Sequence, residues 1–178
     1  MIIVSGLPRS GTSLMMNILY HNGMKIFTDG KRMPDESNPK GYFEIEEIGE
    51  KIKRDSSFLE GKNGCVKILS LFLEHIRGDH KIIFMERDLD ENFASIEKMS
   101  GEPVSDEEKT AFKKHLIEIK KRLGGKDVVY ISYNALIESP ESELMKLKKF
   151  LPQLDIGKSM EVIDKSLYRN RNLKKENA

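Results

Sequence analysis

A glycine-rich stretch near the N-terminus, residues 6–13 (GLPRSGTS), combines the residue types that bind phosphate. It follows a short apolar run and precedes a segment whose apolar residues have helical spacing. Glycines let the backbone curl so that N–H groups point inward, and a helix N-terminus adds partial positive charge. This context predicts a phosphate-binding loop. The groups expected to hold the anion are the amides of Ser10, Gly11, Thr12 and Ser13 and the side chain of Arg9.

The predicted loop lacks the lysine of loops that cleave nucleotide triphosphates. In those loops lysine directly follows the second glycine and works with magnesium, but here Thr12 follows Gly11. Ser13 occupies the usual hydroxyl position. We therefore expect chemistry other than ATP cleavage, with no metal required. A P-loop kinase of small molecules stays an alternative, in which Glu86 or Asp88 would bind magnesium.

Two motifs together resemble the sulfotransferases that use 3′-phosphoadenosine 5′-phosphosulfate (PAPS). The family loop reads Pro-(Lys/Arg)-Ser-Gly-Thr-(Thr/Ser), and residues 8–13 match it. The second family motif is an Arg-Asp pair at a strand end, with a serine eight residues after the arginine, which Arg87, Asp88 and Ser95 match. The resemblance implies sulfuryl transfer to a hydroxyl or amine acceptor and release of adenosine 3′,5′-bisphosphate. It also implies that Arg87 and Ser95 hold the 3′-phosphate.

Weaker similarities extend the resemblance over nearly the whole chain. Tyr133 lies in a segment similar to the family's Tyr-Glu-Asp-Leu element near the adenine, and Lys67 resembles the lysine near the transferring group. Arg169 belongs to a loose counterpart of the C-terminal Arg-Lys-Gly element that contacts the nucleotide. Residues 38–44 (NPKGYFE) resemble small bacterial members.

The general base is the point at which the sequence departs from the family. Cytosolic members place a catalytic histidine two residues after the lysine, where this chain has Leu69. We predict Glu44 as the base and expect Tyr42 and Phe43 to form an apolar wall that raises its pKa. The alternative for Glu44 is a solvated glutamate at the start of the next helix. The alternative for the whole protein is a nucleotide-binding module without catalytic activity. The other candidates for the base are Asp35, Glu36 and His75, and the remaining histidines, His21, His80 and His115, are interpreted as surface residues.

The elements that position these residues are predicted from apolar patterning. Four short, continuous apolar runs are typical of parallel strands buried on both faces, and helical patterns lie between them. The expected strands are residues 2–5, 65–69, 81–86 and 128–132. The expected helices are residues 12–22, 45–54, 90–99 with Asp90 as cap, 105–123, 140–151 and 158–166. This alternation predicts an α/β fold, a P-loop-type three-layer sandwich whose mostly parallel sheet has helices on both faces.

Composition limits the class of protein and its partners. The 178 residues fit a single sulfotransferase-like P-loop domain, 1–178, with an irregular segment at 27–64 expected on the acceptor side and a frayed tail at 172–178. The chain has 30 basic and 29 acidic residues, so its charge is nearly balanced and no nucleic acid partner is expected. Cys65 is the single cysteine, and no leader or membrane span is recognised, so we expect a cytoplasmic protein. The sequence indicates neither the acceptor nor the oligomeric state.

Overall fold

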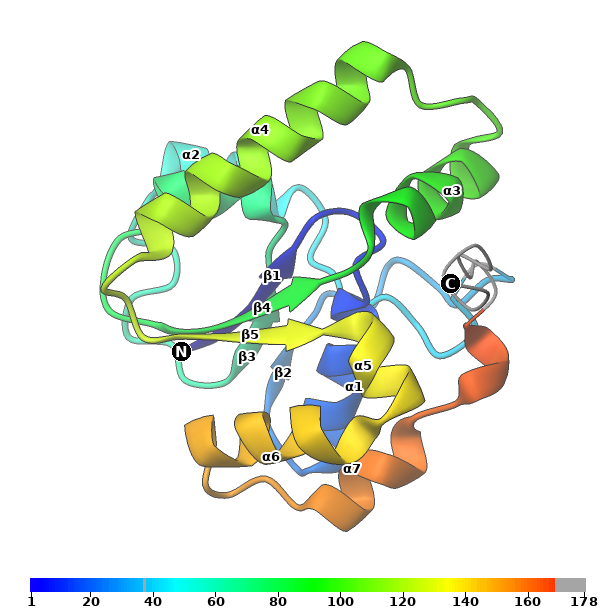
Figure 1. The fold of residues 1–178 in the computed structure, drawn as a ribbon. Helices are drawn as coiled ribbons and strands as arrows, with labels where there is room; N and C mark the ends of the chain where they lie inside the picture. The colour runs from blue at the N-terminus through cyan, green and yellow to red at the C-terminus, as the bar shows by residue number, and fades with distance from the viewer. Residues whose placement is uncertain (37, 169–178) are drawn as a thin grey trace.

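The fold is built on one parallel sheet, whose strand order is β2-β3-β1-β4-β5 (Figure 1). The computed structural model describes residues 1–36 and 38–168. The strands are β1 (Ile2–Gly6), β2 (Ile26–Phe27), β3 (Cys65–Lys67), β4 (Lys81–Glu86) and β5 (Val128–Ser132). The predicted α/β class and all four predicted strands are confirmed, although β3 ends two residues early. β2 was not predicted, because two residues show no periodicity.

Both faces of the sheet are buried, as the continuous apolar runs predicted. Successive residues of a strand point to opposite faces. In β1, Ile3 packs into one apolar cluster and Val4 into the other, and both are fully buried. A strand that is buried on both faces needs apolar residues at every position rather than at alternate ones.

Helices cover the two faces of the sheet unequally (Figure 1). Helices α1, α5, α6 and α7 lie on one face, whereas α2 and α4 lie on the other. The bounds are α1 (Thr12–His21), α2 (Ile48–Arg54), α3 (Leu89–Ser100), α4 (Asp106–Leu123), α5 (Tyr133–Glu138), α6 (Pro140–Phe150) and α7 (Ile156–Val162), with 3₁₀ helices η1 (Ser70–His75) and η2 (Lys165–Leu167). None of the helices in residues 1–36 and 38–168 has the length and apolarity needed to cross a membrane.

Several helix boundaries differ from the predictions. The side chain of Asp88, rather than of Asp90, caps α3, because it accepts hydrogen bonds from the amides of Asp90 and Glu91. The expected helix 45–54 begins only at Ile48, so Glu44 lies in irregular chain. Helix α5 was not predicted, since it follows β5 without a linker.

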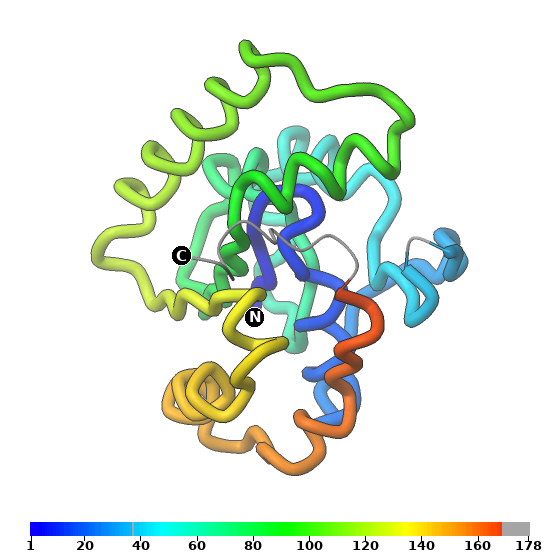
Figure 2. The backbone as a smooth tube through the Cα atoms, turned by 45° about the vertical axis from the view of Figure 1, so that its right-hand side comes forward, coloured from blue at the N-terminus to red at the C-terminus, as the bar shows by residue number. Residues whose placement is uncertain are grey.

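The chain reverses direction across the sheet at β1. From β1 it passes to the edge strand β2, returns through β3, and then continues on the other side of β1 with β4. Ligands of open α/β sheets bind at such a switch point, beyond the carboxyl ends of the strands. The segment 28–47 follows β2 and lies beside α7 and η2 (Figure 2), and its described residues, 28–36 and 38–47, belong to no helix or strand. The predicted irregular segment 27–64 is thus irregular only in part, because it also contains α2.

Candidate phosphate-binding site

The loop between β1 and α1 has the backbone shape of an anion cradle. Gly6, Arg9 and Gly11 all have positive φ angles, of 153°, 65° and 94°. Such alternation turns successive N–H groups toward one point. Among the described residues no side chain caps α1, and its first turn contains no acidic residue, so its first amides are available to a ligand. The Ser10 amide is an exception to the prediction, because it donates to the Leu7 carbonyl at 3.2 Å.

Close packing, as well as the φ angle, requires glycine at both Gly6 and Gly11. A Cβ atom at Gly6 would lie 2.4 Å from the Ser10 hydroxyl oxygen and 2.6 Å from the Met85 carbonyl oxygen. One at Gly11 would lie 2.3 Å from the Tyr133 ring. Tyr133 therefore packs directly on the loop, although it begins a helix.

A cavity of about 290 Å³ opens beside this loop. The predicted site residues that line it are Arg9, Gly11, Thr12, Ser13, Glu44, Lys67, Arg87, Ser95 and Tyr133. Ser10 does not line it, because its buried hydroxyl faces Gly6, and Arg169 lies outside the described residues. Six lysines and arginines but only two carboxylates line the cavity, so the local field is positive although the net charge of the chain is +1.

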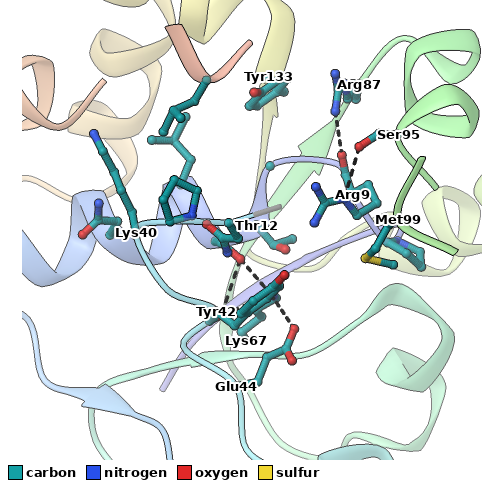
Figure 3. Close-up of a pocket in the computed structure, with 18 of the residues that line it drawn as sticks. Arg9, Thr12, Lys40, Tyr42, Glu44, Lys67, Arg87, Ser95, Met99 and Tyr133 are labelled. Carbon is teal, nitrogen blue, oxygen red and sulfur yellow. Dashed lines mark hydrogen bonds and ion pairs between the residues drawn. The ribbon is translucent and has the colours of Figure 1, made fainter. Parts of the chain in front are cut away.

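On one side of the loop, three predicted residues meet (Figure 3). The Arg9 guanidinium donates through Nε to the Ser95 hydroxyl at 3.1 Å, and Arg87 donates through Nη1 to the Arg9 carbonyl at 3.1 Å. Arg87 follows the end of β4, and Ser95 lies in α3, where its helical position turns it back toward that strand end. The structure thus brings together the residues that the resemblance assigned to a 3′-phosphate.

Arg87 forms an ion pair with a buried carboxylate, Glu91. Glu91, only 5% exposed, lies one helical turn along α3 with Oε2 3.5 Å from Arg87 Nε. The Tyr168 hydroxyl donates to both oxygens of Glu91, at 2.8 and 2.9 Å, and the Asn134 amide donates to Oε2 at 2.8 Å. Burial and the neighbouring Glu91 carboxylate raise the pKa of Tyr168 to about 12, which keeps this phenol a donor.

On the other side of the loop, Lys67 reaches the loop hydroxyl (Figure 3). Its ammonium donates to the Ser13 hydroxyl at 2.9 Å, to the Tyr42 carbonyl at 3.2 Å and to Glu44 Oε1 at 2.7 Å. Lys67 pairs with Val4 in the parallel register, so it ends β3 beside the loop that leaves β1. A lysine that the loop sequence lacks is therefore supplied by the neighbouring strand. Burial lowers the pKa of Lys67, and the Glu44 carboxylate opposes this effect.

The expectation that Glu44 has a raised pKa is wrong. Burial does raise it, but the ammonium of Lys67 and the guanidinium of Arg32 outweigh burial, and the pKa lies below its usual value. Arg32 donates to Glu44 Oε2 at 2.8 Å. Tyr42 does not form the predicted apolar wall, because its partners are charged groups. The Arg32 guanidinium stacks on its ring at 3.5 Å, and its hydroxyl donates to Asp35 at 2.8 Å.

Sequence reasoning missed several residues of the site. Arg32 was missed, and Tyr42 was expected only as part of an apolar wall, because both come from irregular chain, which has no periodicity to show which way a side chain points. Glu91 did carry a signal, since its spacing of four from Arg87 is a spacing at which ion pairs form along a helix, although Arg87 itself precedes α3. None of the four histidines lines the cavity. No group of three or more potential metal-ligating side chains occurs within residues 1–36 and 38–168.

Comparison with known proteins adds no family. No family model and no curated protein matches the chain. The functional argument therefore depends on the motifs and on the geometry of the site.

Proposed function

We propose that the protein is a PAPS-dependent sulfotransferase. The observation that carries this proposal is the pair of basic groups on opposite sides of one phosphate loop. Arg87 with Arg9 and Ser95 forms one, and Lys67 with Ser13 forms the other. A ligand with a 3′-phosphate and a 5′-phosphosulfate carries anionic groups at two separate positions and so matches this division.

The nucleotide side of the site accounts for binding. The amides of Gly11, Thr12 and Ser13 at the start of α1 would receive the 5′-phosphosulfate. Arg87 and Ser95 would hold the 3′-phosphate, because a guanidinium fork binds phosphate oxygens in two places at once. The Arg9 side chain, bonded to Ser95, extends this positive region back to the loop. Tyr133, packed on Gly11, lies where it can contact the nucleoside.

The Lys67 side of the site accounts for transfer. The acceptor oxygen forms a bond to sulfur while the bond between sulfur and the 5′-phosphate oxygen breaks, and the acceptor proton passes to a base. Negative charge grows on the leaving oxygen, and the Lys67 ammonium and the loop amides are placed to stabilise it. Glu44 is the candidate base, with its carboxylate 2.7 Å from the Lys67 ammonium.

The Lys67–Glu44 ion pair gives a physical reason why the donor would bind before Glu44 takes the proton of the acceptor. Without nucleotide, Lys67 and Arg32 hold the pKa of Glu44 low, which makes it a weak base. A bound sulfonate competes with Glu44 for the ammonium. If Lys67 shifts toward the sulfonate, Glu44 loses one of the two cations that lower its pKa, so its pKa should rise and make it a stronger base once the donor is bound.

The kinase alternative has less support in the geometry. Glu86, a possible magnesium ligand, pairs with Lys120, while the Asp88 side chain caps α3. Neither residue lines the loop cavity. The Ser13 hydroxyl, which would contact magnesium in an ATP-cleaving loop, accepts a hydrogen bond from Lys67 instead.

Thermal unfolding with matched ligands tests the proposal. Adenosine 3′,5′-bisphosphate should raise the melting temperature well above the values with AMP or with ATP and magnesium, because only the first uses the Arg87 side. A ligand at a hundred times its dissociation constant adds about 2.7 kcal/mol, which raises the melting temperature by a few degrees at this chain length. Equal shifts with the bisphosphate and AMP would contradict the proposal, and a larger shift with magnesium–ATP would favour a kinase.

A further inference from the structure

The loop cavity continues into a second hollow that runs along α1. This outer hollow, of about 560 Å³, shares Asn17, Lys40 and Val162 with the lining of the loop cavity. We call it the α1 groove; it is lined by Asn17, Tyr20, His21, Lys40, Phe43, Glu161 and Val162. These residues form the boundary between the two hollows, so a molecule in the groove that extends past Lys40 would reach the Ser13–Lys67 side of the loop.

Asn17 gives the groove a largely buried polar side chain whose amide has no hydrogen-bond partner among the described residues. Asn17 is only 6% exposed, and no described residue hydrogen-bonds to its side-chain amide. Ser13 and Asn17 are four residues apart on α1, so they share one face of the helix, with about 5–6 Å between their Cβ atoms. A buried amide without a partner is costly unless a ligand or water bonds to it. It offers both donors and an acceptor, which match hydroxyl groups.

The outer end of the groove presents aromatic rings. Tyr20 is 57% exposed, and its ring centroid lies 6.1 Å from that of Phe43 and 5.4 Å from that of His21. Exposed rings provide flat apolar faces against which the C–H face of a sugar ring can lie, while the sugar hydroxyls stay in water. Lys40 lines both the groove and the loop cavity, and its ammonium donates to the Val162 carbonyl at 2.8 Å.

The charges of the groove differ from those of the loop cavity. Apart from His21, its charged lining residues are Lys40 and Glu161, which have opposite signs. A polyanionic acceptor would need a surplus of cations here, as in the loop cavity. A long-chain alcohol would need a continuous apolar lining, whereas the described lining of the groove also includes the polar groups of Asn17, Lys40 and Glu161.

From these features we infer that the α1 groove is the acceptor site and that the acceptor is a neutral oligosaccharide. This inference rests on the proposed sulfotransferase function. The hydroxyl that reacts would lie beside Glu44 and Lys67, the adjoining sugar would bond to Asn17, and a further sugar would lie on Tyr20. The transfer forms an O-sulfate on the sugar and releases adenosine 3′,5′-bisphosphate and a proton.

Transfer from radiolabelled PAPS tests the acceptor class. The probes are two series of neutral oligosaccharides of increasing length, maltose to maltohexaose and the N-acetylated chitobiose to chitohexaose. They are compared with 2-naphthol and 1-hexanol. Catalytic efficiency should rise with length in one series and exceed that for both alcohols. If no saccharide is sulfated, or if naphthol or hexanol is preferred, the inference is overturned. Adenosine 3′,5′-bisphosphate binding, measured in parallel, separates the two proposals: retained binding leaves the proposed function standing, whereas its loss removes both.

Variants in the groove give the second readout. Asn17→Leu and Tyr20→Ala should each raise KM for the best saccharide about tenfold, the cost of one lost good contact. The affinity for adenosine 3′,5′-bisphosphate should stay unchanged, and Tyr20→Phe, which keeps the ring, should behave as wild type. Met145→Ala, which removes a similarly exposed apolar side chain from α6, is the control.

A binding experiment without turnover completes the test. In ¹⁵N-labelled protein saturated with the bisphosphate, chitohexaose or maltohexaose should shift the Asn17 side-chain amide resonances. Unchanged Asn17 resonances with both sugars, or KM values unaffected by both Asn17→Leu and Tyr20→Ala, would rule out the groove as the acceptor site.

Discussion

The two sides of the phosphate loop are built in different ways. On the Arg87 side, the functional groups come from the end of β4 and from α3, whose regular geometry fixes Arg87, Glu91 and Ser95 relative to one another. On the Lys67 side, the lysine comes from β3 and its partner Ser13 from α1, but its other two partners, Glu44 and Tyr42, belong to irregular chain. Regular elements therefore position the anion-binding groups, whereas side-chain contacts hold the groups near the acceptor.

Each side also contains a buried ion pair, and the two pairs differ in how freely they can rearrange. Arg87 and Glu91 are 7% and 5% exposed, and Tyr168 and Asn134 fix the carboxylate. In the other pair Lys67 is 7% exposed, but Glu44 is 29% exposed and lies in irregular chain. The comparison predicts a fixed binding side and a side that rearranges when the donor binds.

The largest effect is expected from Lys67→Ala. Loss of the ammonium should lower the rate of sulfuryl transfer about 10²–10³-fold, as when one preorganised stabilising group is removed. Affinity for adenosine 3′,5′-bisphosphate should fall much less than the rate, because the loop amides, Arg87 and Ser95 still bind this product. Initial rates and calorimetry measure the two quantities, and Lys113→Ala, which removes an exposed lysine of α4, is the control. An equal loss of rate and affinity would show that Lys67 belongs to the binding side.

Glu44→Gln tests whether the rearranging side supplies the base. The rate should fall about 10²-fold or more, with the bisphosphate affinity retained. Wild-type activity should decline as pH falls through the pKa of Glu44 in the donor complex, because only the carboxylate accepts a proton. The variant should lack this acidic decline. Full activity of Glu44→Gln would return the search to Asp35, Glu36 and His75.

Arg87 and Ser95 test the fixed side. Arg87→Lys keeps a charge near Glu91 but loses the guanidinium fork, so it should weaken bisphosphate binding by about 1.5 kcal/mol, or about tenfold. Ser95→Ala removes one neutral donor and should cost less than Arg87→Lys. AMP affinity should be unchanged in both variants. A parallel loss of AMP affinity, measured by calorimetry, would mean that neither residue distinguishes a 3′-phosphate.

The smallest effect is expected from a change at Tyr168, whose hydroxyl bonds to Glu91, the ion-pair partner of Arg87. Tyr168→Phe removes the hydroxyl that donates one bifurcated hydrogen bond to Glu91 and accepts one from Asn134, and it should lower the free energy of unfolding by about 1 kcal/mol at neutral pH. The pKa of Tyr168 is raised to about 12, so its stabilising effect is complete below the usual pKa near 10 and is lost as pH rises toward 12.

Urea unfolding at several alkaline pH values checks this prediction. The wild-type protein should lose more stability than Tyr168→Phe between about pH 10 and pH 12. Cys65, whose pKa burial raises to about 11, contributes the same loss to both proteins and cancels in the difference. Identical pH profiles would show that Tyr168 is not the titrating group.

Sequence reasoning succeeded where local pattern and chemistry coincide. Strand β1 and the glycines after it predicted the loop, because an apolar strand, a left-handed turn and a helix start each have a local residue signature. The position of Arg87 and Ser95 was predicted for the same reason, since a strand end followed by a helix fixes their spacing. The cap of α3 was placed two residues too late, because Asp88 and Asp90 are both good caps.

The amino-acid sequence by itself determined the parallel sheet, the glycine-rich loop and the side chains that meet near it from regular elements. Only the tertiary structure decided that Lys67 reaches Ser13, that Arg32 and Lys67 lower rather than raise the pKa of Glu44, and that the Asn17 amide lies in a groove with no hydrogen-bond partner among the described residues. The reason is physical. A pKa and a hydrogen-bond partner depend on groups that chain folding brings close from distant positions, and irregular segments such as 28–47 have no repeating geometry from which those neighbours could be predicted.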